Sequence, residues 1–146
     1  MIKSKIKYFF AFLLVGCSAL KPSLKEGKLH KTKSGLEYTI TQKGEGEVPQ
    51  KGDRIKIKFL GYFGDEVVES SNKRKAPFVF QVGVGQVIKG WDEAFLLFPE
   101  GTEANLTIPP KLGYGENKVG KIPANSVLHY NVVLEEIIHP PVPYDV

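Results

Sequence analysis

A single short segment of the chain carries the apolar spacing of a helix, and this limits the folds that the chain can adopt. Four apolar side chains recur there at positions i, i+3, i+4 and i+7, which lie on one helix face: Trp91, Ala94, Phe95 and Phe98. Asp92 and Glu93 fall in the first turn, where the helix dipole favours negative charge. Pro99 and Gly101 then end the pattern. A helix of about two turns cannot bury the rest of the chain, so other elements must.

Most of the remaining chain alternates apolar and polar residues, as half-buried strands do. In the clearest case, over residues 54–61, Ile55, Ile57 and Phe59 lie on one face and basic residues lie on the other. The alternation predicts strands over six ranges: 36–40, 54–61, 67–70, 78–82, 104–108 and 128–134. Five to six strands and one short helix favour an α+β fold in which one antiparallel sheet wraps over the helix.

The N-terminus has the composition of an export signal. Three lysines precede an apolar run over residues 8–15, which is too short to span a membrane as a helix. The segment ends in L-V-G-C, which resembles a bacterial lipobox and holds the only cysteine, Cys17. The resemblance implies cleavage before Cys17 and attachment of lipid to it; the alternative is an unmodified cysteine after an ordinary signal peptide.

These features predict a signal peptide over residues 1–16 and a lipid-anchored tether over residues 17–34. Ser18 carries no signal for retention in the inner membrane. We therefore expect the protein in the cell envelope, anchored in the outer membrane on its periplasmic side, with the membrane as one partner through Cys17.

The net charge argues against nucleic acid as a partner. The whole chain has 20 Lys and Arg residues, 16 Asp and Glu residues and a net charge of +4. Three of the lysines and none of the acids lie in residues 1–16, so the mature chain is nearly neutral at +1. A surface that binds phosphate backbones is therefore not expected. Residues 21–33 keep five lysines against Glu26 and are either a membrane-proximal segment or a solvated linker.

The motifs that would indicate a cofactor or a metal are incomplete. Residues 115–122 nearly match a phosphate-binding loop, but Ile122 lacks the hydroxyl that binds magnesium. Gly83 and Gly85 begin a dinucleotide motif, but Ile88 replaces its third glycine. No ligand spacing links the histidines: His30, His129 and His139. We therefore expect no cofactor and no metal, and the chain also lacks the G-x-S-x-G elbow of a hydrolase.

Aromatic side chains recur on different predicted elements: Phe59, Phe78, Phe80, Trp91, Tyr114 and Tyr130. Most aromatic residues of a small domain fill its core, and that interpretation stays open for each of them. Tyr114 differs because it lies between glycines in a predicted loop, where no ring is needed to fill the interior. A tyrosine there can present its O–H to a pocket while its ring is buried. Trp91 is accordingly either core or the floor of a pocket.

Four sequence motifs follow one another over the second half of the chain. They are V-I-K-G-W-D-E-A at 87–94, E-G-T-E-A-N-L-T-I-P-P at 100–110, Y-G at 114–115 and I-P-A-N at 122–125. In this order and spacing they resemble the FKBP family of peptidyl-prolyl cis-trans isomerases. The resemblance extends over about residues 36–138. It implies a half-barrel of antiparallel strands around the short helix, an isomerase domain over 35–138 and a proline-rich tail over 139–146.

The resemblance implies a proline-binding pocket and assigns residues to it. Trp91 would form the floor under the proline ring, with three aromatic walls: Phe59, Phe78 and Tyr130. Four aliphatic residues would complete the walls, the rim and the loop side: Val68, Val87, Ile88 and Ile122. A proline-containing polypeptide would therefore be the client.

The polar groups of this pocket are also implied by the resemblance. The Ile88 N–H would donate to a substrate carbonyl, and the Gln86 carbonyl would accept from the substrate. Tyr114 would hydrogen-bond a second substrate carbonyl. Glu69 would stand where the family usually has aspartate, with Arg74 as its ionic partner. The expected catalytic residues are then Glu69, Trp91 and Tyr114.

Isomerisation of an X-Pro bond needs neither a nucleophile nor a cofactor. Resonance sets the barrier at about 18–20 kcal/mol, while the cis form lies only about 0.5–1 kcal/mol above trans. A catalyst therefore has to bind the twisted amide more tightly than the planar one. The twisted amide has lost charge separation, so an apolar, water-poor pocket with a few fixed hydrogen-bond groups suits it.

Several positions depart from the family pattern. Phe59 lacks a hydroxyl that tyrosine often supplies, Val68 replaces a phenylalanine, Glu69 is one methylene longer than aspartate, and Lys121 replaces an apolar residue. These changes predict a looser hold on the proline and low activity.

Two functions stay open. One is an isomerase that assists the folding of exported proteins. The other is a lipid-anchored binding module, including a subunit of an envelope machine for gliding motility or secretion, with little turnover. The chain lacks the helical extension that some exported relatives use to dimerise, which favours a monomer.

Overall fold

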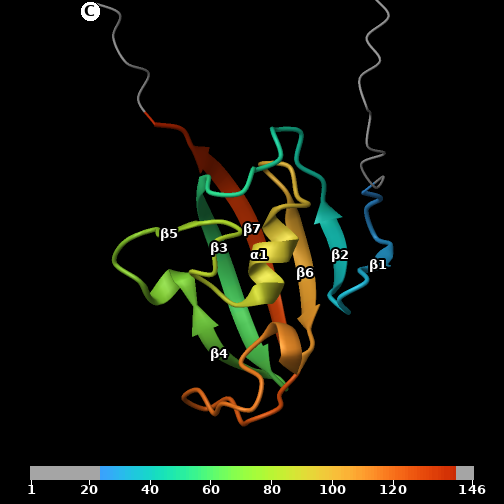
Figure 1. Ribbon diagram of the computed structural model, residues 1–146, viewed down its shortest axis with the longest axis vertical. Coiled ribbons are helices and arrows are strands. Elements are labelled where there is room, and N and C mark those ends of the chain that lie inside the picture. The colour runs from blue at the N-terminus through green and yellow to red at the C-terminus, as the bar shows by residue number, and fades with distance from the viewer. Residues whose placement is uncertain (1–23, 141–146) are drawn as a thin grey trace, which may run out of the picture.

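The computed structural model describes residues 24–140, which form one antiparallel sheet packed on a short helix (Figure 1). The strands are β1 (Leu29–Lys31), β2 (Glu37–Gln42), β3 (Arg54–Phe63), β4 (Glu66–Ser70), β5 (Phe78–Gln81), β6 (Glu103–Ile108) and β7 (Leu128–Ile138). The helix is α1 (Lys89–Phe95), and two short 3-10 turns are η1 (Ser71–Lys73) and η2 (Pro110–Leu112). The strand order is β1-β2-β6-β7-β3-β4, with β5 paired to the first half of β3. The α+β prediction is confirmed, but the sheet has seven strands rather than five to six.

The additional strand is β1, which lies inside the range 17–34 where the sequence predicts a tether. Three residues are too few to show alternation, and Leu29 is 62% exposed, so the strand has no sequence signal. It is held by antiparallel pairing with β2, in which His30 lies opposite Tyr38. The two rings also stack, with centroids 5.0 Å apart. The sheet therefore begins before residue 35.

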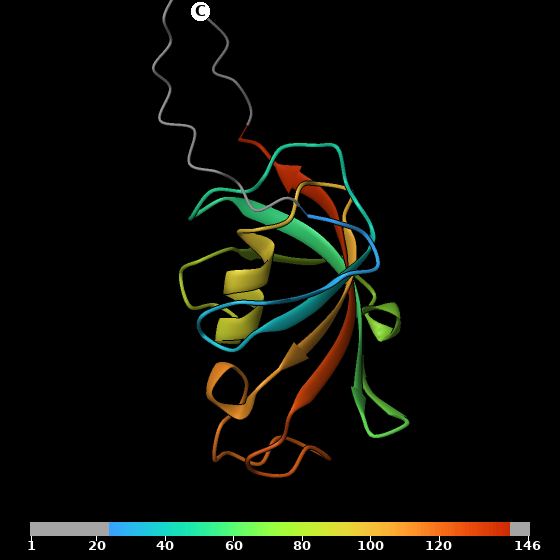
Figure 2. The same ribbon diagram turned by 90° about the vertical axis from the view of Figure 1, so that its right-hand side faces the viewer.

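The long strands β3 and β7 pair in the middle of the sheet. Along β3 the apolar residues on one side are buried, and along β7 buried and more exposed residues alternate in the same way. Their register shifts between Lys56 and Ile57, an irregularity that bends a strand and increases its twist. Figure 2 shows the sheet curving around α1, which agrees with the half-barrel expected from the sequence.

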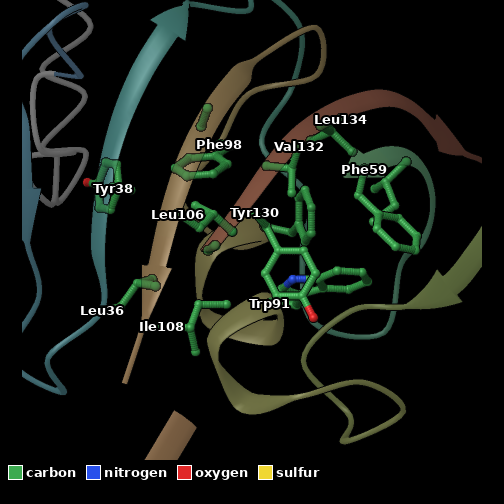
Figure 3. Packing of buried hydrophobic residues seen from close by; sticks show 14 of the residues in the cluster. Leu36, Tyr38, Phe59, Trp91, Phe98, Leu106, Ile108, Tyr130, Val132 and Leu134 are labelled. Carbon is green, nitrogen blue, oxygen red and sulfur yellow. The ribbon is translucent and has the colours of Figure 1, made fainter. Parts of the chain in front are cut away.

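The helix α1 lies on the concave face of the sheet and buries four residues: Gly90, Trp91, Ala94 and Phe95. Figure 3 shows Trp91 among the core side chains of β3, β6 and β7. The absence of a side chain at position 90 lets the helix approach β6, since a Cβ there would lie 2.7 Å from Ile108 Cγ2. Phe98 is fully buried, as its spacing suggests, but it lies beyond the end of the helix.

The predicted signal peptide, Cys17 and the last six residues of the tail lie outside the described residues. Both ends of the described chain lie in the upper half of Figure 1, and the loop after η2 lies at the opposite end of the sheet. Within residues 24–140, no helix combines the length and the apolar character needed to cross a membrane.

Candidate functional site

A cavity of about 550 Å³ opens beside α1, between the sheet and the loops at its edge. Its lining comes from β3, β4, β5, α1, β7 and the connections between them: Phe59, Glu69, Ser70, Arg74, Phe78, Gly85, Gln86, Val87, Ile88, Trp91, Tyr114 and Tyr130. The structure thus gathers in one cavity all but two of the residues that the resemblance assigns to a pocket. The two that lie elsewhere are Val68 and Ile122.

Trp91 forms the apolar floor of the cavity and is 5% exposed. Three aromatic rings that line the cavity meet the indole edge to face, with centroid distances of 4.8 Å to Phe59, 5.1 Å to Tyr130 and 5.7 Å to Phe78. Such geometry matches the electron-rich face of one ring with the edge of another. The indole N–H is buried and has no hydrogen-bond partner within the described part of the chain. The indole therefore adds apolar surface to the site and no exposed polar group.

The carboxylate of Glu69 is held by two tyrosine hydroxyls at the side of the cavity. Tyr130 donates to one oxygen at 2.6 Å, and Tyr114 donates to the other at 3.1 Å. Burial first, and then the carboxylate, raises the pKa of Tyr114 to about 12, and burial and the hydrogen bond raise the pKa of Tyr130 as well. Both hydroxyls therefore stay protonated donors near neutral pH. Tyr130, on the neighbouring strand β7, therefore gives Glu69 a hydroxyl donor that Phe59 cannot provide.

Gly61 makes this arrangement possible. In the sheet it lies opposite Tyr130 of β7 on one side and opposite Glu69 of β4 on the other. A Cβ at this position would lie 2.6 Å from Cε1 of Tyr130 and 3.3 Å from Cβ of Glu69. The missing side chain leaves the space in which the tyrosine ring reaches across to the carboxylate.

Arg74 is not the ionic partner of Glu69 that the sequence predicts. None of the ion pairs among residues 24–140 joins them; instead the guanidinium carbon lies 4.5 Å from the centroid of the Phe78 ring. This cation–π contact is favourable at the surface. Glu69 instead accepts its hydrogen bonds from Tyr114 and Tyr130, while Arg74 is held by the Phe78 ring.

The connection between β5 and α1, which supplies Gln86, Val87 and Ile88 to the cavity, is tied to the helix by Asp92. Its two carboxylate oxygens accept from the N–H groups of Gly83 and Gly85, each at 2.8 Å. Both glycines have positive φ, +78° and +80°, a conformation that favours glycine. Asp92 therefore does more than satisfy the helix dipole, and the G-x-G sequence serves a tight turn.

Two polar backbone groups of this connection are available to a ligand. The side chain of Gln86 is used within the protein, accepting from the Gln81 N–H at 2.9 Å. Neither the Ile88 N–H nor the Gln86 carbonyl makes a backbone hydrogen bond within the described residues. These are the groups that the resemblance assigns as donor and acceptor for the substrate.

Val68 and Ile122 have structural explanations for lying outside the cavity. Tyr62 pairs with Val67 and Gly61 pairs with Glu69, so Val68 is the extra residue of a β-bulge. A bulge turns a side chain away from the direction that regular alternation would give it. Ile122 is 2% exposed and belongs to the core, where a tight turn with Val119 holds its backbone.

Three residues of the site were not predicted from the sequence. Ser70 and Gly85 line the cavity, and Asp92 fixes one of its walls. The only available signal was the pair of glycines preceding an acid in the first helical turn, which is compatible with many loops.

Comparison with known proteins agrees with the geometry. A family model described as FKBP-type peptidyl-prolyl cis-trans isomerase matches residues 45–135. FK506-binding protein 1 of Aspergillus oryzae is 37% identical over 114 residues, covering 70% of this chain and 98% of that protein. The FKBP-type 22 kDa peptidyl-prolyl cis-trans isomerase of Escherichia coli is 38% identical over 132 residues, covering 89% of this chain.

The relatives differ in length from this chain. It spans 63% of the Escherichia coli protein and less than a quarter of several fungal proteins named FK506-binding protein 4. Among solved structures, the crystal structure of AtFKBP13 superposes with a TM-score of 0.72 at 32% identity, over 76% of this chain and 99% of that one. Because the family model covers more than half of the residues and the relatives cover the same domain, this chain belongs to the FKBP-type peptidyl-prolyl cis-trans isomerase family.

Proposed function

We propose that this protein isomerises X-Pro bonds in client polypeptides. The observation that carries the proposal is the cavity, in which four packed aromatic rings form an apolar floor and wall beside two unpaired backbone groups. A largely apolar concave site with a few convergent polar groups is the usual form of a ligand pocket. Its chemistry suits an amide that loses polarity as it twists.

The backbone groups orient the substrate while its proline ring lies on Trp91. The Ile88 N–H donates to a substrate carbonyl and the Gln86 carbonyl accepts a substrate N–H, so the peptide is held on both sides of the reacting bond. The ring-lined site excludes water from the X-Pro amide. Loss of water disfavours the polar planar amide more than the twisted one, which lowers the barrier to rotation.

Tyr114 can exchange its hydrogen-bond acceptor during this cycle. Its bond to Glu69 is the longer of the two, at 3.1 Å against 2.6 Å for Tyr130. If a substrate carbonyl takes over the Tyr114 hydroxyl, Tyr130 still holds the carboxylate. The two tyrosines therefore support turnover although Phe59 has no hydroxyl. Val68 lies in a bulge and does not line the cavity, so its replacement of a phenylalanine does not alter the cavity wall.

The proposal is tested by exchange NMR on a short X-Pro peptide, with and without the purified protein. We expect a clear acceleration of cis-to-trans exchange, and we expect FK506, the macrolide for which the relatives are named, to abolish it. An absence of acceleration by folded protein that still binds the peptide would favour the alternative, a binding module with little turnover.

We also propose that the protein is lipid-anchored in the cell envelope and acts on exported proteins. The support is the basic start, the apolar run and the L-V-G-C sequence ending at Cys17.

Expression in a bacterium with a labelled fatty acid tests the anchor. We expect the label and the membrane association in the wild-type protein and neither of them in Cys17→Ala, because a thioether needs the cysteine sulfur. A Ser18→Ala variant is the matched control and should keep both. Equal labelling of Cys17→Ala would contradict the proposal.

A further inference from the structure

We propose that the preferred clients carry acidic residues next to the proline, because Arg74, a cation with no ion pair within the described residues, lines the cavity and also belongs to a basic groove beside it. The inference rests on the isomerase function proposed above and adds the class of client. The groove, of about 290 Å³, shares Arg74 and Phe78 with the cavity. Its lining includes most of the connection from β4 to β5, a segment that lies at the left edge of the ribbon in Figure 1. Lys56 and Lys58 lie on the sheet face opposite Phe59, so the cavity and most of the groove lie on different faces of the sheet and meet only at Arg74 and Phe78. A peptide that leaves the cavity past Arg74 can reach the near end of the groove.

Positive charge predominates in the groove. Its charged lining consists of four cations and one acid: Lys56, Lys58, Arg74, Lys75 and Glu135. Glu135 lies 2.9 Å from Lys58 and 3.7 Å from Lys56, so one carboxylate is shared by two lysines. Glu136 lies opposite Lys56 in the sheet but does not line the groove. Acidic client side chains complement this excess of positive charge.

Arg74 lines both the cavity and the groove, and it has no ion pair among the residues that the structure describes. Its guanidinium is held against the face of Phe78, 4.5 Å from the ring centroid. Stacking on a ring fixes the plane of a guanidinium and leaves its N–H groups free to bind a carboxylate. A client carboxylate can therefore bind there with little loss of side-chain freedom.

Glu69 is the negative group that could oppose such a client. Glu69 lines the cavity but does not line the groove. Each of its oxygens already accepts a tyrosine hydroxyl, which spreads its charge into the protein. The acidic client residue is consequently expected at a position that reaches the groove, beside the proline and not over the floor.

Exchange NMR on a peptide series tests the inference. One Glu is moved through the two positions before and the two positions after the proline, and each peptide has a matched Gln version. At low salt we expect kcat/KM for Glu to exceed that for Gln by about fivefold at one position or more, from an exposed charge pair with Arg74. We expect Lys at the same position to fall below Gln, and the preference to shrink below about twofold at 0.5 M salt.

Variants locate the preference. Arg74→Gln should bring the Glu-to-Gln ratio close to one, and Lys75→Glu should lower it further by reversing an exposed charge. Lys43→Gln removes the same charge from an exposed loop that lines neither hollow, and should keep the wild-type ratio. An equal loss of preference in Lys43→Gln would overturn the inference, because net charge alone would then explain it.

Failure of the inference and failure of the function give different results. If neutral peptides are accelerated and every Glu-to-Gln ratio is close to one, the isomerase stands and the acidic preference is wrong. If no peptide is accelerated by folded protein, both are wrong.

Discussion

Replacing Trp91 by alanine should lower kcat/KM for an X-Pro peptide by about a hundredfold, equivalent to roughly 2.7 kcal/mol of lost transition-state binding. In the proposed function the indole is the floor under the proline ring, and three other rings of the cavity pack on it edge to face. Without it, water enters the space beneath the amide and the contact surface is lost. We expect the free energy of unfolding to fall too, by about 3–5 kcal/mol as for other buried aromatic residues. Exchange NMR and urea unfolding measure the two effects.

The control for this variant separates stability from catalysis. Phe98 is fully buried and does not line the cavity. Phe98→Ala should therefore lose a similar amount of stability and keep its activity per folded molecule. Trp91→Phe, which retains a ring, should lie between wild type and Trp91→Ala. Full turnover in folded Trp91→Ala would mean that the proline does not bind in this cavity.

Gly61→Ala should impair both folding and catalysis although it adds one methyl group. That methyl would lie 2.6 Å from Cε1 of Tyr130, whose ring is 2% exposed and cannot easily move. The φ of Gly61 is not positive, so the alanine backbone is unstrained and the effect is steric. We expect the free energy of unfolding to fall by about 1–3 kcal/mol, as in other overpacked cores. Displacement of the ring would also break the 2.6 Å bond to Glu69 and lower the isomerisation rate several-fold.

A double-mutant cycle with Tyr130→Leu checks the cause. In the Tyr130→Leu background the clashing ring atom is absent, so Gly61→Ala should cost under about 1 kcal/mol, since contacting residues are not additive. Urea unfolding of the four proteins gives the coupling free energy. Equal costs in both backgrounds would show that the methyl group acts on something other than Tyr130.

The fold was largely predictable because its strands bury one face. The alternation over 54–61 and 128–134 lies within β3 and β7, which both reach further along the chain. β1 was missed because its three residues are held only by pairing with β2, which sequence periodicity does not report. The core position of Phe98 was likewise predicted, while the end of the helix before it was not.

The site was less predictable, since its polar contacts depend on tertiary structure. Arg74 follows Glu69 closely in sequence, but the hydroxyls that occupy the carboxylate come from residues 45 and 61 positions further along the chain. Val68 is turned aside by a bulge that shows only in the register of β3 with β4. The role of Asp92 depends on a loop that folds back onto its own helix. Each of these three features depends on contacts in the folded structure, which the local sequence pattern does not predict.

The order of strands in the sheet has a consequence for how the protein matures. β7 lies between β6 and β3, so within the sheet the part formed by β1, β2 and β6 is hydrogen-bonded to the part formed by β3, β4 and β5 through the last strand. Pairings such as Glu37 with Thr107 and Arg54 with Ile138 close long loops, which slows folding. Tyr130, which holds Glu69, also arrives with this strand. A chain that is synthesised from its N-terminus therefore completes the cavity beside α1 only when its last strand joins the sheet.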